Sequence, residues 1–387
     1  DMTYDFDTVN DRRSEFSMKW DVNDGELPMW VADMDFKTAP EITEAIVKRA
    51  EHGIFGYTDV PARWKNAVIS WYKKRHSLTI EYDSLMFSTG VVAAISSIVR
   101  KLTTPNENVV LLTPVYNIFF NSIINNGCRA LECPLIYDGE KYEINWTDFE
   151  EKLSDKQTTL FILCNPHNPT GVIWDRKTLA KIGALCKKYH VTVISDEIHC
   201  DITDPGYDYV PFASVNDVCK YNSITCIAPT KTFNLAGLQT SAVYVPDEYL
   251  FHKVWRALNT DEVAEPNVFA MTASIAAYEH GEKWLDELRE YLYRNKKAVR
   301  GFIKKEIPEI NIVNSHATYL LWLDCSKICE NTDALADDIR AKTGLYLSKG
   351  SAFGKGGEAF LRMNTACPKR TLDDGLNRLK TYFKLIK

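Results

Sequence analysis

The chain has 387 residues, 45% of them hydrophobic, which is enough for one large domain and a smaller one. Its formal net charge of -6 at pH 7 gives no net attraction toward nucleic acid or an anionic membrane, so we expect small molecules as its partners. No apolar run is long enough to span a bilayer, and the first residues lack the apolar stretch of a signal peptide.

Between residues 85 and 245, short β-rich runs alternate with helical patterns, which indicates a mostly parallel sheet covered by helices on both faces. The predicted strands are residues 108–113, 159–164, 191–195, 223–228 and 241–245. Residues 175–189 predict an amphipathic helix that begins at an Asp175 cap, and Thr147 with Glu150 forms the capping-box signature of another helix.

After Pro266 the pattern changes to long helices, followed by short strands at 319–323 and 360–363 and a closing helix from Thr371. We therefore predict an α/β protein with two domains. Residues 48–285 form the large one, and residues 1–47 and 286–387 form a smaller α+β domain.

Three predicted strands are each followed by a polar residue that could carry chemistry. Asn168 lies in Asn-Pro-His-Asn-Pro-Thr-Gly after the second strand, Asp196 ends the third, and Lys231 follows the fourth in Ala-Pro-Thr-Lys-Thr-Phe-Asn. Taken singly they read as a turn residue, a helix cap and a surface lysine. Together they favour a ligand site, because ligands of parallel sheets bind at the carboxyl ends of strands.

This trio of amide, carboxylate and amine matches what pyridoxal 5'-phosphate (PLP) requires. The amine forms an imine with the aldehyde, the carboxylate holds the pyridine nitrogen protonated, and a donor meets the phenolic oxygen. Residues 88–92, Ser-Thr-Gly-Val-Val, precede a helical pattern and offer backbone N–H groups to a phosphate, with Gly90 allowing close approach. We expect PLP as the cofactor, and no metal: Cys200 beside His199 is read as a buried thiol, and the ten cysteines fit a reducing, cytoplasmic setting.

Over almost its whole length the sequence resembles the fold type I PLP enzymes of the class I/II aminotransferase superfamily. The motifs that carry the resemblance are Asn168-Pro-Thr-Gly, Asp196-Glu and Thr230-Lys-Thr-Phe-Asn. Within that superfamily, Met29-Trp-Val-Ala-Asp-Met-Asp-Phe, Asp196-Glu-Ile-His and Phe360-Leu-Arg-Met-Asn look like the MalY/PatB group of cystathionine β-lyases, or C–S lyases.

The resemblance implies the PLP-dependent transferase fold and a set of roles. Lys231 is the Schiff-base lysine, Asp196 the pyridinium partner, Asn168 the donor to the phenolic oxygen and Tyr116 the aromatic residue that stacks on the ring. Gly90, Val91, Val92 and Thr230 hold the phosphate, Arg362 binds the substrate α-carboxylate, and Asn168 and Ala32 also border the substrate. Tyr57 reaches the phosphate of a neighbouring subunit's cofactor, which implies a homodimer with shared sites.

Three positions depart from the aminotransferase pattern. Gln239 stands where aspartate aminotransferases carry a phosphate-binding arginine, and Ala228 stands where a serine is expected, so the phosphate depends more on the residues around Gly90. His199 stands where many aminotransferases have a tyrosine, and it either contacts the cofactor or supports Asp196.

The resemblance implies α,β-elimination, in which Lys231 removes the α-proton of L-cystathionine, L-cysteine or a similar amino acid and a thiol or hydrogen sulfide leaves. Pyruvate and ammonia are the other products. Two alternatives stay open: an aminotransferase that uses the same residues, and a regulatory binding protein on the same scaffold.

Overall fold

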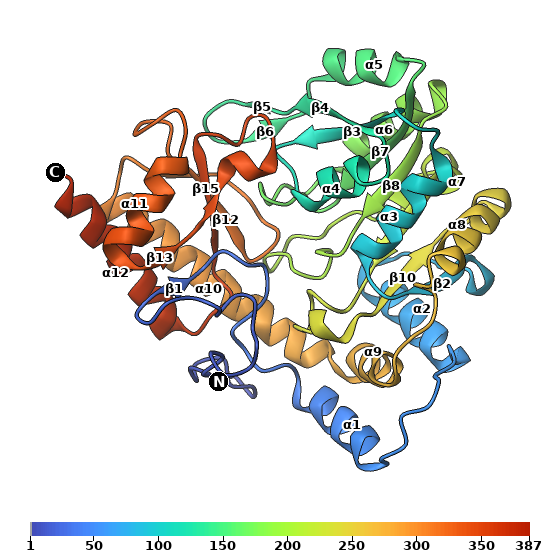
Figure 1. Ribbon diagram of the computed structural model, residues 1–387, viewed down its shortest axis with the longest axis horizontal. Coiled ribbons are helices and arrows are strands. Elements are labelled where there is room, and N and C mark those ends of the chain that lie inside the picture. The colour runs from blue at the N-terminus through green and yellow to red at the C-terminus, as the bar shows by residue number, and fades with distance from the viewer. Residues whose placement is uncertain (1) are drawn as a thin grey trace.

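The computed structural model describes residues 2–387. Its central feature is a seven-stranded sheet in the order β2-β10-β9-β8-β7-β3-β4 (Figure 1). β10 is antiparallel to both of its neighbours, and the other strand pairs are parallel. The predicted mostly parallel sheet is confirmed. The strands are β2 (Leu85–Ser88), β3 (Asn108–Thr113), β4 (Arg129–Pro134), β7 (Thr158–Cys164), β8 (Thr192–Asp196), β9 (Ser223–Ile227) and β10 (Ser241–Tyr244).

Helices cover both faces of this sheet. Successive side chains of a strand point to opposite faces, so Val109 and Leu111 of β3 pack in one apolar cluster and Val110 and Leu112 in another. α3 (Val91–Leu102), α4 (Ile118–Ile124) and α8 (Glu248–Thr260) contribute to the first cluster, and α5 (Trp146–Ser154), α6 (Arg176–Lys188) and α7 (Asp217–Tyr221) to the second. Burial on both faces explains why these strands read as continuous apolar runs.

A second, antiparallel sheet has the order β11-β12-β15-β14. Its strands are β11 (Asn311–Ile312), β12 (Leu320–Asp324), β14 (Ser348–Lys349) and β15 (Phe360–Asn364), and it shares an apolar cluster with α10 (Glu282–Glu306), α11 (Asp333–Thr343) and α12 (Lys369–Leu385). β1 (Leu27–Pro28) pairs with β13 (Leu345–Tyr346), so the segment around residue 27 lies beside the segment around residue 345 (Figure 1). The predicted boundary between the two domains, at residues 285 and 286, falls inside the continuous helix α10, and the division into domains there stays a prediction.

A third group of helices, α1 (Pro40–Glu51), α2 (Ala62–His76) and α9 (Val268–His280), packs around Phe6 and the start of α10. The remaining elements are the hairpin β5 (Ile136–Tyr137) and β6 (Tyr142–Glu143), and four short 3-10 helices at Tyr82–Ser84, Phe212–Ser214, Ala236–Leu238 and Gly350–Phe353. Among the described residues, no helix is both long and apolar enough to cross a membrane.

Most predicted elements lie within two residues of the observed ones, and one expectation is wrong. α6 is capped as predicted, since Asp175 accepts a hydrogen bond from the Thr178 backbone at 2.7 Å. α5, however, begins before Thr147, and its cap is Asn145, which accepts from the Asp148 backbone at 3.2 Å. The antiparallel direction of β10 within the mostly parallel sheet could not be predicted, because strand direction is set by the connections and leaves no local pattern.

Candidate active site

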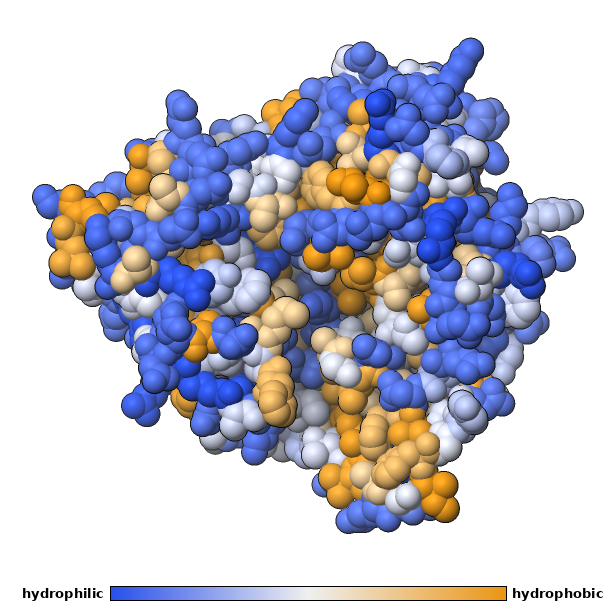
Figure 2. Space-filling model, viewed as in Figure 1, coloured by the Kyte–Doolittle hydropathy of each residue, from blue (hydrophilic) through white to orange (hydrophobic). Residues whose placement is uncertain are grey.

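A cavity of about 780 Å³ lies where β7, β8 and β9 end and the second sheet closes over them. Figure 2 shows this face of the molecule hollowed at its centre. Of the predicted site residues, all but one line the cavity: Ala32, Gly90, Val91, Val92, Tyr116, Asn168, Asp196, His199, Thr230, Lys231 and Arg362. Strand register explains part of this, because Asp196 pairs with Cys164 on one side and Cys226 on the other.

Lys231 enters the cavity just beyond β9. Its Nζ donates to the backbone oxygen of Ala32 at 2.6 Å, which ties the amine to the N-terminal segment. Burial lowers the pKa of Lys231 to about 8, and the charge of Arg362 acts in the same direction. An amine with this pKa is partly neutral near pH 7 to 8 and is suited to act as a nucleophile and a base.

Asp196 is buried at the end of β8 with one hydrogen-bond donor, the Ile198 backbone N–H at 3.1 Å. Burial raises the pKa of Asp196 to about 7, against the opposing effects of that N–H and of Lys231. A buried carboxylate with so few partners favours a cationic ligand at this position.

His199 is neutral at this end of the cavity, because burial and the charges of Lys231 and Arg362 lower its pKa to about 3. Its Nδ1 is buried without a hydrogen-bond partner. The neutral imidazole can therefore form one hydrogen bond to a ligand, and it brings no charge to the cavity.

Arg362, on β15, is buried and has no carboxylate within ion-pair distance among the described residues. Its guanidinium donates to the Asn168 side-chain oxygen at 3.2 Å and to the Trp30 backbone oxygen at 2.8 Å, while its Nε has no partner. Burial lowers its pKa to about 10. A buried cation that is held only by neutral oxygens favours an anionic group, such as a carboxylate, on a ligand.

The N-terminus of α3 supplies a place for a second anionic group. Gly90 is the N-cap, its φ of -177° is ordinary extended backbone, and a Cβ at this position would meet nothing within 4 Å. The space beside the free N–H groups of the first turn is therefore open, and it is bordered by Thr230 and Gln239.

Two predicted tyrosines lie in different places. Tyr116 lines the cavity, its ring makes an edge contact with Phe119 at 5.4 Å, and burial raises its pKa to about 12. Tyr57 is fully exposed, at 106%, in the segment between α1 and α2, and the structure does not bring it to this cavity. Its expected contact with a second subunit stays a prediction.

Several lining residues were not predicted individually. Met18 and Trp30 come from the N-terminal segment, and Tyr346, Lys349 and Phe353 from the far end of the chain. Trp30 lies in the Met29–Phe36 motif, which was the one signal that could have found it. The others lie at unremarkable positions in the sequence, and long-range contacts bring them together: β1 pairs with β13, Lys349 pairs with Leu361, and the Val115 N–H donates to the Phe353 oxygen.

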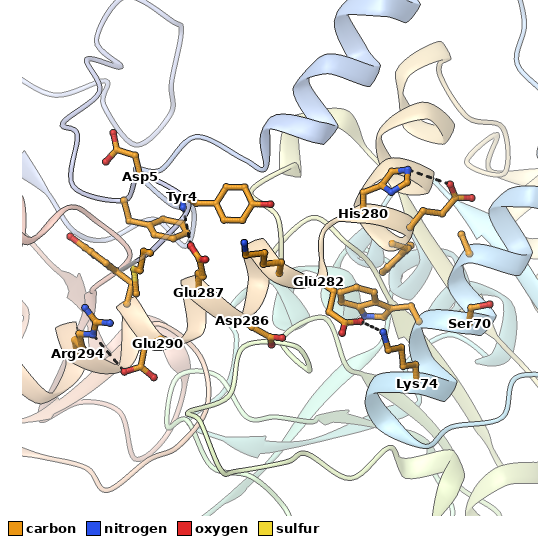
Figure 3. A pocket seen from close by; sticks show the side chains of 18 of the residues that line it. Tyr4, Asp5, Ser70, Lys74, His280, Glu282, Asp286, Glu287, Glu290 and Arg294 are labelled. Carbon is orange, nitrogen blue, oxygen red and sulfur yellow. Dashed lines mark hydrogen bonds and ion pairs between the residues drawn. The ribbon is translucent and has the colours of Figure 1, made fainter.

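A larger, open groove of about 1810 Å³ runs over α2 and α10 beneath the N-terminal residues (Figure 3). Its charged side chains pair with one another, as in Lys74 with Glu282 at 2.8 Å and Arg294 with Glu290 at 3.5 Å. None of the predicted site residues lines it. The groove is an open surface whose lining includes seven carboxylates and five lysine or arginine side chains.

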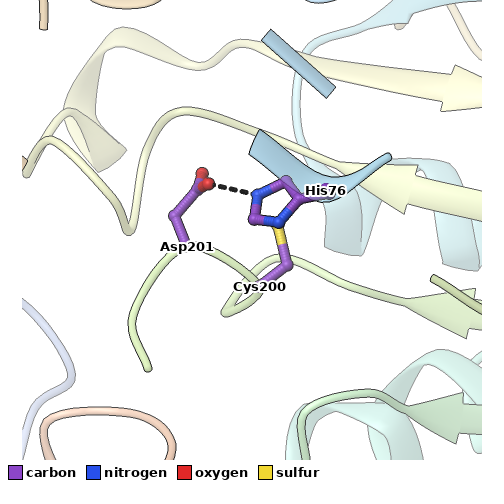
Figure 4. Close-up of side chains that lie close together, drawn as sticks. All are labelled: His76, Cys200 and Asp201. Atoms are coloured by element: carbon purple, nitrogen blue, oxygen red, sulfur yellow. Dashed lines mark hydrogen bonds and ion pairs between the residues drawn. The ribbon is translucent and has the colours of Figure 1, made fainter. Parts of the chain in front are cut away.

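His76, Cys200 and Asp201 also lie close together, behind the cavity (Figure 4). The Asp201 carboxylate already accepts from His76 at 2.6 Å, from the Trp71 indole at 3.1 Å and from the Thr232 hydroxyl at 2.9 Å. These three donors satisfy the carboxylate. Through Asp201, Thr232, which follows Lys231 in the chain, is linked to α2.

The fold and the cavity are those of a large class of α/β enzymes, and comparison with known proteins defines the class. The sequence model of the family "Aminotransferase class I and II" matches residues 27–379, and the chain belongs to this family.

Within it, the chain is 43% identical over 382 residues to cystathionine beta-lyase PatB of Bacillus subtilis, covering 97% of this chain and 98% of that protein. It is 30% identical to protein MalY of Escherichia coli, covering 99% and 100%. The solved structure of a PLP-bound C–S lyase from Staphylococcus hominis superposes with a TM-score of 0.91 at 34% identity, over 98% of both chains. The predicted resemblance to the MalY/PatB group is confirmed.

Proposed function

We propose that this protein is a PLP-dependent carbon–sulfur lyase that acts on S-substituted L-cysteines such as L-cystathionine. The overall reaction takes one amino acid and one water to pyruvate, ammonium and a thiol. The observation that carries the proposal is the convergence of three under-partnered charged groups, Lys231, Asp196 and Arg362, on one cavity. Relatives named cystathionine beta-lyase and C–S lyase support the same reaction.

The residues present fit PLP. Asp196, buried with one N–H donor, holds the protonated ring nitrogen, and Asn168, whose side-chain N–H groups are uncommitted in this structure, is the donor to the phenolic oxygen. Tyr116, which lines the same cavity, would supply the aromatic contact to the ring. The open N-terminus of α3 at Gly90, Val91 and Val92, together with the Thr230 hydroxyl, holds the phosphate. His199 adds a neutral contact on the same side as Asp196.

When bound, PLP withdraws electrons from the substrate's α-carbon, which permits loss of the α-proton and of a sulfur group on the β-carbon. The chain's own residues arrange this event. The Lys231 amine anchors the cofactor and, once released, holds and moves the α-proton, a task that its lowered pKa of about 8 assists. Arg362 and Asn168 would orient the substrate through its α-carboxylate, and the Ala32 oxygen holds the free Lys231 amine.

We further place the active enzyme as a homodimer, in which Tyr57 of one subunit reaches the phosphate bound by the other. An exposed aromatic side chain in an extended segment, beside exposed Ile54 and Phe55, supports this arrangement. The ten cysteines are all free thiols, which fits a reducing compartment such as the cytoplasm.

The function is tested by incubating the holoenzyme with L-cystathionine and no added 2-oxo acid, while pyruvate and free thiol are measured. We expect both products in equal amounts, and none from Lys231→Ala. Borohydride reduction followed by mass spectrometry of peptides should locate the cofactor on Lys231. A cofactor attached to another lysine, or an active Lys231→Ala variant, would contradict the assignment.

A further inference from the structure

A buried polar cluster lies behind the cavity, between the loops that follow β8 and β9. At its centre is Asp201, whose side chain is fully buried (Figure 4). Its Oδ1 accepts from Nε2 of His76 at 2.6 Å and from the Trp71 indole at 3.1 Å, and its Oδ2 accepts from the Thr232 hydroxyl at 2.9 Å. Asp201 and Thr232 are 2% and 0% exposed, so their contact does not depend on a second subunit.

Lys231 lies in a compact turn, residues 229–235, that follows β9. The N–H groups of Phe233 and Leu235 donate to backbone oxygens at the start of this turn, at 2.9 and 2.8 Å. These hydrogen bonds make the turn one unit. Thr232, the residue after Lys231, is therefore placed to fix the position of the lysine.

The loop after β8 is also compact, because the N–H groups of Cys200 and Ile202 donate to backbone oxygens earlier in the loop, each at 3.1 Å. The hydrogen bond between Asp201 and Thr232 connects two turns, one that begins at Asp196 and one that contains the proposed Schiff-base lysine. Among the described residues, no other hydrogen bond joins residues 198–204 to the lysine turn.

Asp201 is a charged carboxylate with a full set of donors, in contrast to Asp196. Burial acts to raise the pKa of Asp201, but the hydrogen bond and charge of His76, followed by the Thr232 hydroxyl, hold that pKa below its ordinary value. Asp196 has one donor, and burial raises its pKa to about 7. A buried charge with three donors resists displacement of those donors, because each one that moves leaves part of the charge without a partner.

We propose that Asp201 is a positioning residue: through its hydrogen bond to the lysine turn it fixes Lys231 relative to Asp196, so that the two groups meet opposite ends of one cofactor ring. The inference rests on the proposed PLP-dependent function and assigns a further residue to it. In PLP the ring nitrogen, which Asp196 would hold, and the aldehyde carbon, which Lys231 would bind, lie across the ring from each other. The ring fixes the span between them, so a shift of the lysine turn misplaces one of the two contacts.

Two substitutions at Thr232 test the proposal. Thr232→Val replaces the hydroxyl by a methyl group, and Thr232→Ser keeps the hydroxyl. In the valine variant, kcat for pyruvate release from L-cystathionine should fall by about tenfold or more, because a small displacement of the reacting amine is costly. The affinity of the full chain for PLP, measured by titration in the visible spectrum, should fall about two- to tenfold, the range of one hydrogen bond.

KM should change by less than about twofold in the valine variant, because Arg362 and Asn168, which would bind the substrate, lie outside the lysine turn. Thr232→Ser should stay within about twofold of the wild type in kcat and in PLP affinity. A serine variant as impaired as the valine variant would contradict a role for the hydrogen bond.

Thr158→Val is the matched control. Thr158 is buried at the start of β7, at the end of that strand away from the cavity, and its hydroxyl donates to the Lys152 oxygen at 2.7 Å. Both valine variants should lower Tm, since each loses a buried hydrogen bond, but Thr158→Val should leave kcat and PLP affinity unchanged. Equal losses of kcat and PLP affinity in the two variants, or none in Thr232→Val, would overturn the proposal.

A double variant assigns the effect to Asp201. Asp201→Ala removes the acceptor and should lower kcat at least as far as Thr232→Val, and the two changes together should cost less than about a further twofold. Independent, multiplying losses would overturn the assignment, and the Thr232 pair decides the proposal by itself if Asp201→Ala does not fold. A wild-type protein that binds PLP but releases no pyruvate would refute the lyase function, whereas the PLP affinities would still decide the positioning role.

Discussion

At the scale of the residue, the site consists of charged groups that lack their full complement of partners. Asp196 has one N–H donor, Arg362 has only neutral acceptors, and the Lys231 amine donates to the Ala32 oxygen. Such groups cost free energy in the folded chain and are retained where a ligand completes them. The roles of Lys231 and Asp196 were predicted from the ends of strands, but the contact between Lys231 and Ala32 could not be, because 199 residues separate the two.

The raised pKa of Asp196 predicts a dependence of stability on pH in the cofactor-free protein. Its folded-state pKa of about 7 exceeds the ordinary aspartate value of 3.8, so the protonated carboxyl stabilises the fold at low pH and this contribution is lost as pH rises through 7. Thermal melts of cofactor-free protein from about pH 5 to about pH 8 should show a falling Tm, with a shallower slope in Asp196→Asn.

Asp208→Asn is the control, because that carboxyl is exposed. An identical slope in the wild type and Asp196→Asn would contradict the burial argument.

With cofactor bound, Asp196→Asn should keep the cofactor and lose most turnover, since a neutral amide does not hold the ring nitrogen protonated.

Arg362 separates substrate binding from cofactor binding. Arg362→Ala should lower kcat/KM by about tenfold to hundredfold, because a buried charge-assisted contact to the α-carboxylate is lost. Arg362→Lys should restore only part of it, since an ammonium lacks the planar pair of donors. Steady-state kinetics and the visible spectrum of the bound cofactor measure the two effects. Loss of the cofactor with normal substrate binding would instead place Arg362 at the phosphate.

At the scale of the element, the site depends on segments that meet across the whole sequence. The strand 108–113 was predicted at its observed bounds because a buried parallel strand is a continuous apolar run. β2 was missed because its four residues, Leu-Met-Phe-Ser, include no β-branched residue, and β4 because its residues are mostly half-buried and show no clear pattern. The antiparallel direction of β10 was missed because long-range connections decide it. The cap at Asn145 was missed because it lies two residues before the predicted cap at Thr147.

The segment 30–36 also helps to build the site. It carries Trp30 and Ala32, although it has no regular secondary structure. The Asn364 amide donates to the oxygens of Val31 at 2.6 Å and Asp33 at 2.7 Å and so holds this segment over the cavity. Asn364→Ala should lower kcat/KM by about tenfold to hundredfold through small displacements of Arg362 and Lys231, with the cofactor still on Lys231.

The exposed Asn311→Ala is the matched control, because it removes an amide hydrogen bond to the Gly139 oxygen at 2.7 Å, on another strand of the same sheet. If the two variants reduced kcat/KM equally, the effect would be one of general stability, and the segment would have no special role.

At the scale of the whole molecule, the predicted α/β fold and family are confirmed, and the assembly stays a proposal. Family membership follows from a match over residues 27–379 and from relatives that cover nearly the entire chain. The exposed position of Tyr57 agrees with the expectation that it reaches outside its own subunit, and equally with an ordinary surface aromatic residue. Its proposed function depends on a second copy of the chain.

Mixed dimers test the shared site. Tyr57→Ala should weaken PLP binding, and Lys231→Ala should abolish turnover. If Tyr57 serves the partner's site, a dimer of one Tyr57→Ala and one Lys231→Ala subunit has one intact site and one with both defects. Co-refolded or co-expressed mixtures should therefore exceed the activity of the separate variants at limiting PLP. Strictly additive activity would show that each subunit works alone.

The central claim is that this chain eliminates sulfur from an amino acid, and the fate of the substrate over many turnovers tests it most directly. The rival aminotransferase stops after one turnover per site when no 2-oxo acid is supplied, because the amino group stays on the cofactor. We predict that the wild-type holoenzyme, given excess L-cystathionine alone, releases pyruvate, ammonium and thiol in equal amounts far beyond the number of active sites. A halt at one equivalent per site, with no thiol released, would contradict the account.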